Sequence, residues 1–170
     1  LPAAGYDEEV LRALCALQAE YNAPDIVARL AVLGAFMGSW LERRAHYLIL
    51  SNNQKKKFAT LIDMVSAIDD LDADTVKRLI YRHGLYNTIQ TVLLFMSWQD
   101  EENPELVDLA RSWSAPSFPL SGEDVKASGI GQGPQIGEML AAIEEWWIGE
   151  DFQPDRAACL ARLAEMASQL

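Results

Sequence analysis

The chain has 170 residues, of which 50% are hydrophobic, so it is long enough to bury a core as one domain or as two small ones. Its formal net charge of -11 excludes a protein that coats nucleic acid over its whole surface, and its composition fits no class of disordered chain. The sequence has neither a run of about 18 uncharged apolar residues nor a basic segment at its start, which predicts a cytoplasmic protein without a membrane span or signal peptide.

Helical periodicity dominates the sequence. Apolar residues recur three and four positions apart almost throughout, and no convincing stretch alternates with a period of two. Residues that favour helix starts precede these runs, and one short helix is expected to end at Gly84. The expected starts are Asp7, Asn22 with Pro24, Ser51 or Asn52, Asp72 or Asp74, and Asn103 with Pro104. We therefore predict an all-α protein with its most apolar run, Leu85–Trp98, at the centre of the core.

One clear linker, APSFP, divides the sequence and predicts a boundary near residue 115. Before it we expect a larger helical body domain over residues 1–114. After it we expect a small C-terminal part, 115–170, with a glycine-rich turn and two helices at roughly 134–148 and 155–168. The predicted architecture is a multi-helical array in two parts.

Two adjacent tryptophans, Trp146 and Trp147, lie in the first of these C-terminal helices. Neighbouring side chains point about 100° apart on a helix, so the two indoles cannot share the centre of one buried stripe. We expect one of them in the core. The other is expected to pack under the linker or to stack on a base, and packing is the favoured interpretation.

Charge is distributed unevenly along the chain. Acids outnumber lysines and arginines by 12 to 10 over residues 1–100 and by 13 to 4 over residues 101–170. Residues 42–57 reverse this balance with a net charge of +4. The cations there are Arg43, Arg44, Lys55, Lys56 and Lys57. Because lysines at a helix start oppose the helix dipole, RNA contact and plain solvation remain two open interpretations of this patch.

The stretch SGEDVKASGIGQGPQIGEML, residues 121–140, crowds glycines before an apolar helical run. Gly133 followed by Pro134 predicts a helix start with free backbone N–H groups. Such groups can hold a phosphate, which makes Gly133 and Gly137 candidate RNA-binding residues. A tight turn that only seats the last two helices is the competing interpretation.

The clustered carboxylates of DDLDAD do not form a recognisable metal motif. A calcium loop that begins at Asp70 would need glycine where Thr75 stands and an acid where Tyr81 stands. Helix capping by Asp72 or Asp74 is therefore the expected role, and no metal ligand is predicted.

The histidines and cysteines do not form a recognisable metal-binding or catalytic motif either. His46 and His83 have no second ligand at metal spacing, and no serine or cysteine stands in a nucleophile elbow. The widely separated Cys15 and Cys159 are expected to be buried thiols. A second basic group around His83 is expected to be a solvated helix face rather than a phosphate site. It consists of Lys77, Arg78, Arg82 and His83. We predict no catalytic residue and no cofactor within this chain.

The glycine-rich stretch resembles two known kinds of sequence. The short Gly129-Ile130-Gly131 resembles the turn of a helix-hairpin-helix. The longer run FPLSGEDVKASGIGQGPQIGEMLAAIEEWWIGEDFQPDRAACLARL resembles the C-terminal segment of class II bacterial CCA-adding tRNA nucleotidyltransferases and their poly(A) polymerase relatives. The positions that carry this family pattern are Gly122, Asp124, Val125, Gly129, Gly133, Pro134, Ile136 and Gly137. Upstream, LILSNNQKKKFATL is similar to a helix of the same family that opens with Ser-Asn, here Ser51 and Asn52.

The family resemblance implies that this chain is the helical body and tail of a longer enzyme, as does its start at Leu1 rather than methionine. In that family an N-terminal head domain binds two magnesium ions and a neck domain reads CTP or ATP, and neither motif stands in these residues. The body and tail hold the tRNA through backbone contacts. The acidity of residues 101–170 departs from what strong RNA binding by the tail requires.

We therefore predict a C-terminal RNA-binding region that is inactive alone. It would dock tRNA or another RNA 3′ end for a catalytic domain of the same parent chain, which supplies Mg²⁺ and uses ATP or CTP. The alternatives are a helix-hairpin-helix module that binds DNA and a helical protein-interaction domain. Self-association is left open.

Overall fold

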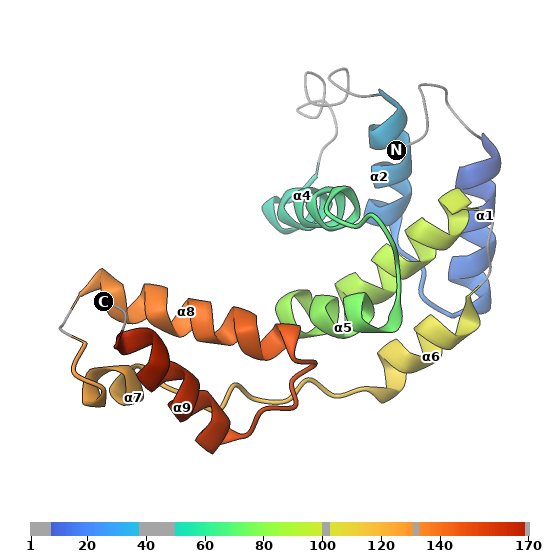
Figure 1. The fold of residues 1–170 in the computed structure, drawn as a ribbon. Coiled ribbons are helices and arrows are strands. Elements are labelled where there is room, and N and C mark those ends of the chain that lie inside the picture. Colours follow the sequence, from blue (N-terminus) through green and yellow to red (C-terminus); the bar gives the residue numbers. More distant parts are fainter. Residues whose placement is uncertain (1–7, 38–49, 100–102, 131–132, 169–170) are drawn as a thin grey trace. The chain divides into compact units, whose positions relative to one another are not determined.

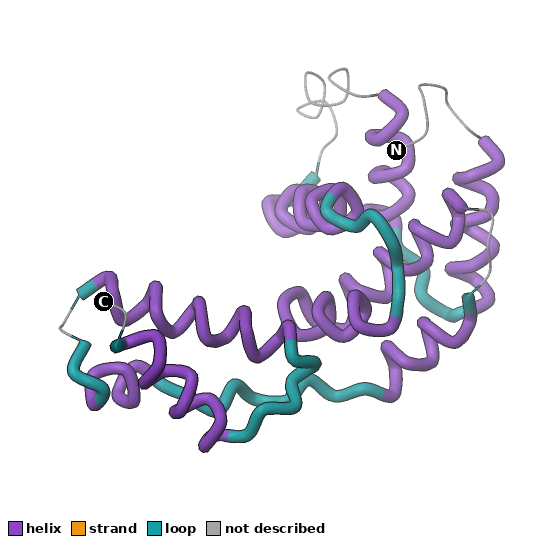
Figure 2. The backbone as a smooth tube through the Cα atoms, viewed as in Figure 1, coloured by secondary structure: helices purple, strands orange, loops and turns teal. Residues whose placement is uncertain are grey.

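Helices joined by loops make up the described part of the protein (Figure 2). The structure is a computed structural model that describes residues 8–37, 50–99, 103–130 and 133–168. No strand occurs in these ranges, and the predicted all-α multi-helical fold is confirmed. The helices are α1 (Glu8–Glu20), α2 (Ile26–Met37), α4 (Asn52–Ser66), α5 (Ala73–Gln99), α6 (Pro104–Ser112), α7 (Gly122–Ala127), α8 (Pro134–Gly149) and α9 (Arg156–Ala167).

The chain divides into two compact units, Leu1–Ser114 and Ala115–Leu170, here called the N-terminal and C-terminal units. In the N-terminal unit, α5 is the central helix and contacts α1, α2, α4 and α6 (Figure 1). Nearly every side chain from Thr88 to Ser97 is buried. The prediction that Leu85–Trp98 forms the centre of the core is confirmed from Thr88 onward and was wrong for Leu85 and Tyr86, which are exposed.

A kink divides α5 at Gly84, whose backbone has φ 78° and ψ 161°. Positive φ is a conformation that glycine adopts readily and that other residues avoid. The predicted helix end at Gly84 is confirmed, because the backbone is non-helical there, and a second helical stretch follows at once and continues to Gln99. The segment around the kink is exposed, including Arg82, His83 and Tyr86.

The helix starts follow the capping pattern with two corrections, of which one is that Asn103 stands at the N-cap of α6 but its side chain accepts no N–H of that helix. Ser51 caps α4 and forms a reciprocal capping box with Gln54, and the Asp72 carboxylate accepts the N–H of Thr75 at 2.7 Å. Both expected caps are confirmed. The cap of α2 is not Asn22 but Asp25, whose Oδ1 accepts the N–H groups of Val27 and Ala28. Asp7, the predicted cap of the first helix, lies outside the described residues.

Trp147 is the centre of the C-terminal unit. It is 2% exposed, and its indole lies against the rings of Phe118 and Phe152, with centroids 5.4 and 5.1 Å away. Its Nε1 donates to the carbonyl of Pro154 at 2.9 Å. Around it, buried side chains come from the linker end, α7, α8 and α9. They are Leu120, Val125, Met139, Ile143, Ile148, Cys159 and Leu163.

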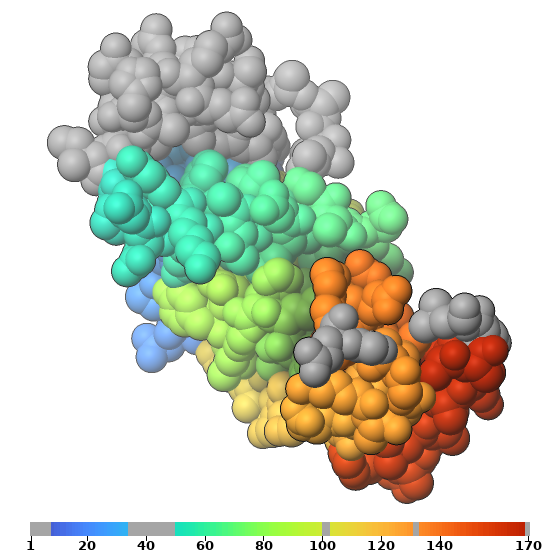
Figure 3. All heavy atoms as spheres, turned by 90° about the vertical axis from the view of Figure 1, so that its left-hand side faces the viewer, coloured from blue at the N-terminus to red at the C-terminus, as the bar shows by residue number. Residues whose placement is uncertain are grey.

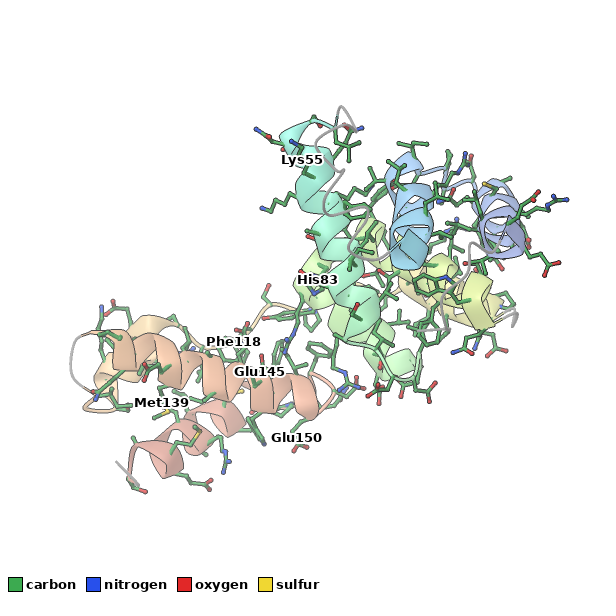
Figure 4. All side chains as sticks on the ribbon, turned by 90° about the horizontal axis from the view of Figure 1, so that it is seen from above. Lys55, His83, Phe118, Met139, Glu145 and Glu150 are labelled. Carbon is green, nitrogen blue, oxygen red and sulfur yellow. The ribbon has the colours of Figure 1, made fainter. Side chains whose placement is uncertain are left out.

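The C-terminal unit contains one helix more than predicted. The six-residue α7 precedes the turn at Gly133, so the described residues of this unit form three helices where two were predicted. α8 and α9 begin and end within one residue of the predicted bounds. Met139 lies on the side of α8 that faces α9 in Figure 4, and Glu145 of the same helix is exposed.

Candidate nucleic-acid interface

The predicted RNA-binding residues fall in different parts of the chain. Lys55, Lys56 and Lys57 lie in the first two turns of α4 in the N-terminal unit. Gly133 and Gly137 lie at the start of α8 in the C-terminal unit. Arg43 and Arg44 lie outside the described residues.

Lys55 and Lys56 project from the exposed face of α4. The capping box at Ser51 holds the start of this helix, and Figure 4 shows Lys55 near that end. Neither ammonium forms an ion pair with another residue of the described ranges. Two adjacent cations are thus presented to solvent on a helix whose first turn has no acid.

Lys57 points the other way. It lies one residue beyond Lys56 and therefore about 100° around the helix, which turns it toward the core. Its ammonium pairs with the Asp25 carboxylate and lies 3.9 Å from the centre of the Tyr86 ring. The Lys57 side chain is 24% exposed and that of Asp25 is 3% exposed. Lys57 therefore has a structural partner that the sequence pattern did not indicate.

The buried carboxylate of Asp25 is charged at neutral pH. Burial acts to raise its pKa, but hydrogen bonds from Lys57, Tyr86 and the N–H of Ala28 outweigh burial, so its pKa lies below the ordinary value. The same carboxylate caps α2. One side chain therefore connects α2 with α4 and α5.

Two buried glutamines extend this polar network. Gln18 of α1 donates to Gln90 of α5 at 2.9 Å, and Gln90 donates to the carbonyl of Ala23 at 3.0 Å. Arg29 donates to Gln18 at 2.7 Å. Sequence reasoning missed these residues. The available signal was a glutamine within an otherwise apolar buried stripe, which in a folded core requires hydrogen-bond partners.

A groove of about 580 Å³ runs between α4 and the first half of α5. These two helices lie side by side in Figure 3, in teal and in green to yellow-green. The basic side chains on the α5 side are Arg78, Arg82 and His83, the last labelled in Figure 4. Burial and the nearby Arg82 lower the pKa of His83. Carboxylates line the same groove, so its charge is mixed: they are Asp63, Asp69 and Asp70.

The start of α8 is exposed from Gly133 to Gln135, and Gly137 is exposed as well. Gly133 has φ 127° and ψ -161°, a conformation that is nearly exclusive to glycine. No side chain caps this helix within the described residues. A Cβ placed on Gly137 would meet nothing within 4 Å. The predicted open helix entry is therefore present as geometry, and its ligand stays a prediction.

An ion pair joins two helix starts in the C-terminal unit. Arg156 of α9 pairs with Asp124 of α7, which also accepts the N–H of Ser121 at 2.8 Å. The Arg156 guanidinium also donates to the carbonyl of Pro119 at 2.6 Å. Hydrogen bonds from Arg156 and Ser121 lower the pKa of Asp124 to about 2, from an ordinary value of 3.8. This pair thus stabilises the fold fully above about pH 4 and is lost as the pH falls toward 2.

The described ranges lack the features of a metal-binding cluster and of a membrane span. They hold no group of three or more histidine, cysteine, aspartate or glutamate side chains that could bind a metal ion. None of the helices described there is long and apolar enough to cross a membrane.

Comparison with known proteins gives partial matches. No protein-family model matches the chain. The chain is 32% identical over 79 residues to CCA tRNA nucleotidyltransferase 1, mitochondrial, of Danio rerio, which is 46% of this chain and 18% of that protein. It is 35% identical over 51 residues to the Homo sapiens protein of the same name, covering 30% of this chain and 12% of that protein. The Mus musculus protein of that name is 33% identical over 51 residues, with the same coverage.

These matches reach less than a fifth of the length of the curated relatives. They show that part of the chain is related to a region of tRNA nucleotidyltransferases. The expected resemblance to CCA-adding enzymes is confirmed at this level.

Proposed function

We propose that this chain is the tRNA-docking region of a tRNA nucleotidyltransferase or poly(A) polymerase-like protein. The partial identity with CCA tRNA nucleotidyltransferases carries this proposal. On this basis the chain binds the RNA and presents its 3′ end to a catalytic domain of the same parent chain.

We propose that Lys55 and Lys56 contact RNA phosphates. Both are exposed on one helix, and RNA duplex is recognised largely through its shape, phosphates and 2′-hydroxyls. Lys57 serves this surface indirectly, because its pairing with Asp25 fixes α4 against α2. Arg43, Arg44 and the backbone at Gly133 and Gly137 remain further predicted contacts.

The parent protein would supply the proposed catalytic domain. We expect Mg²⁺ and either CTP or ATP to bind in the proposed catalytic domain. A bacterial source and a cytoplasmic location stay predictions, and the matched relatives are named as mitochondrial proteins. Whether the parent adds CCA or poly(A) depends on residues in that other domain.

RNA binding by the full chain at two salt concentrations tests the docking role. We expect unmodified tRNA transcript to bind more tightly than duplex DNA of equal length, as measured by fluorescence anisotropy. The double variant Lys55→Glu/Lys56→Glu should weaken tRNA binding about tenfold or more, and the affinity of the original chain should fall as salt rises.

Arg12→Glu is the matched control for charge. Arg12 is an exposed cation on α1 that pairs with Glu8, so its reversal changes charge on a different helix of the same unit. Its effect on tRNA binding should be small compared with that of Lys56→Glu. Equal losses for the two single variants, or no preference for tRNA over DNA, would contradict the proposed role.

A further inference from the structure

The exposed kink in α5 presents an aromatic ring next to the proposed RNA surface. Tyr86 follows Gly84 by two residues and is 51% exposed, while its neighbour Leu85 is 43% exposed. Large apolar side chains with this exposure are few among the described residues. The kink places both on the surface rather than in the core, and Tyr86 there contacts Lys57 of α4.

The Tyr86 ring is held in place from two sides. Its hydroxyl is near enough to the buried Asp25 carboxylate to help lower the pKa of that group, and the Lys57 ammonium lies 3.9 Å from the ring centroid. Both partners belong to the network that connects α2, α4 and α5. A ring that is fixed before binding loses little conformational freedom when a ligand stacks on it.

The surroundings of Tyr86 are cationic. Lys56 precedes Lys57 on α4, and Arg82 is exposed on the turn of α5 before the kink, whereas the lowered pKa of His83 leaves that imidazole mostly neutral at neutral pH. α4 and α5 run antiparallel here, because Lys57 meets Tyr86 while Ala67 lines the groove with Thr75. Asp63, the nearest groove carboxylate along α4, is therefore about 9 Å further along the helix from Lys57.

A fixed, half-exposed aromatic ring among cations is the combination that binds single-stranded nucleic acid. Bases stack on the ring, and the cations neutralise the adjoining phosphates. We propose that Tyr86 is a stacking site for an unpaired base of the bound RNA, with phosphate contacts from Lys56 and Arg82. This inference rests on the proposed RNA-docking function and adds to it a preference for RNA with unpaired nucleotides.

Two RNA probes separate stacking from general binding. One is a short blunt RNA duplex, and the other is the same duplex with a single-stranded extension of mixed sequence. The full chain should bind the extended probe more tightly, as measured by fluorescence anisotropy. Tyr86→Ala should weaken binding of the extended probe by roughly 5- to 100-fold and leave the blunt duplex within about threefold.

Tyr86→Phe and Tyr86→Leu identify the group responsible. Phenylalanine keeps the ring and removes the hydroxyl, so binding of the extended probe should stay within about threefold of the original. Leucine keeps apolar bulk without a ring, so the loss should resemble that of alanine. Thermal unfolding followed by circular dichroism checks that each variant is folded.

Other outcomes would contradict the proposal that Tyr86 is a stacking site. Equal losses on both probes would mean that Tyr86 acts only through the position of Lys57 and α4. No loss on either probe would mean that the exposed ring serves a different partner, such as a protein. If the original chain binds neither RNA, the docking function itself fails. If only the variants at Lys55 and Lys56 lose affinity, docking survives without the stacking site.

Discussion

Different interactions stabilise the N-terminal unit and the C-terminal unit. The N-terminal unit has a large apolar core around α5 and a buried polar network through Gln18, Asp25 and Gln90. The C-terminal unit has a small core around Trp147 and a surface ion pair between Asp124 and Arg156. Polar side chains therefore order the larger unit from inside and the smaller unit from its surface.

The difference has a physical basis in size. A unit of few helices buries a smaller fraction of its surface than a larger one, so each large side chain contributes a greater share of the stability. A buried polar network in turn demands that every member is paired. Substitutions should therefore destabilise the C-terminal unit mainly by removing buried side-chain volume. In the N-terminal unit they should act mainly by leaving a buried polar group without its hydrogen-bond or ion-pair partner.

Trp147→Ala should have the largest effect. Removing a fully buried indole costs about 3–5 kcal/mol, which is most of the stability that a small unit has. Amide hydrogen exchange on the full chain should show protection lost in α7, α8 and α9 while α5 remains protected. Trp146→Ala is the control, because Trp146 is only partly buried and should cost about 1 kcal/mol. Similar losses for both tryptophans would contradict the assignment of Trp147 as the centre of this core.

The adjacent lysines of α4 should give the next effect. Lys57→Ala leaves the Asp25 carboxylate buried without its cation, which costs about 3 kcal/mol. Lys56→Ala should change the free energy of unfolding by about 0.5 kcal/mol or less, because it removes an exposed side chain. Urea unfolding of the two variants measures this contrast. Equal stability of the two variants would show that the Lys57–Asp25 pair contributes nothing to the fold.

Two glycines of the C-terminal unit should give smaller effects of opposite sign. Gly133→Ala forces a side chain into a backbone conformation that costs about 1–3 kcal/mol. Gly137→Ala stands in a helix with open space around it and should stabilise α8 by up to about 1 kcal/mol. Thermal unfolding distinguishes the two signs. Since Gly137→Ala leaves the fold intact, any loss of tRNA affinity in this variant would point to close backbone contact with RNA. A destabilised Gly137→Ala chain would contradict this prediction.

Local sequence signals predicted the parts of the fold that depend on neighbouring residues. Ser51 and Asp72 were identifiable as caps because the cap and the N–H groups it bonds are three residues apart. Most of Leu85–Trp98 was identifiable as core from its apolar composition, although its first two residues are exposed. The six-residue α7 was missed because so short a helix has no periodicity to detect.

The candidate site was only partly predictable for a related reason. Lys55, Lys56 and Lys57 look alike in sequence, and their separation into exposed and buried cations depends on Asp25, which lies 32 residues before Lys57. Likewise the sequence indicated that one of two tryptophans is buried but not which one. Which lysine is paired and which tryptophan is buried depend on how the helices pack, and therefore on contacts between residues that are far apart in the sequence.

The kink at Gly84 has a consequence for protein chemistry. A Cβ added there would meet nothing within 4 Å, so the obstacle to a larger residue is backbone handedness and not space. With φ at 78° and ψ at 161°, the conformation is close to the mirror image of the extended conformations that ordinary L-residues adopt. A D-alanine introduced at this position by chemical ligation would thus fit where L-alanine is strained, and it would stiffen the bend that brings Tyr86 to the surface.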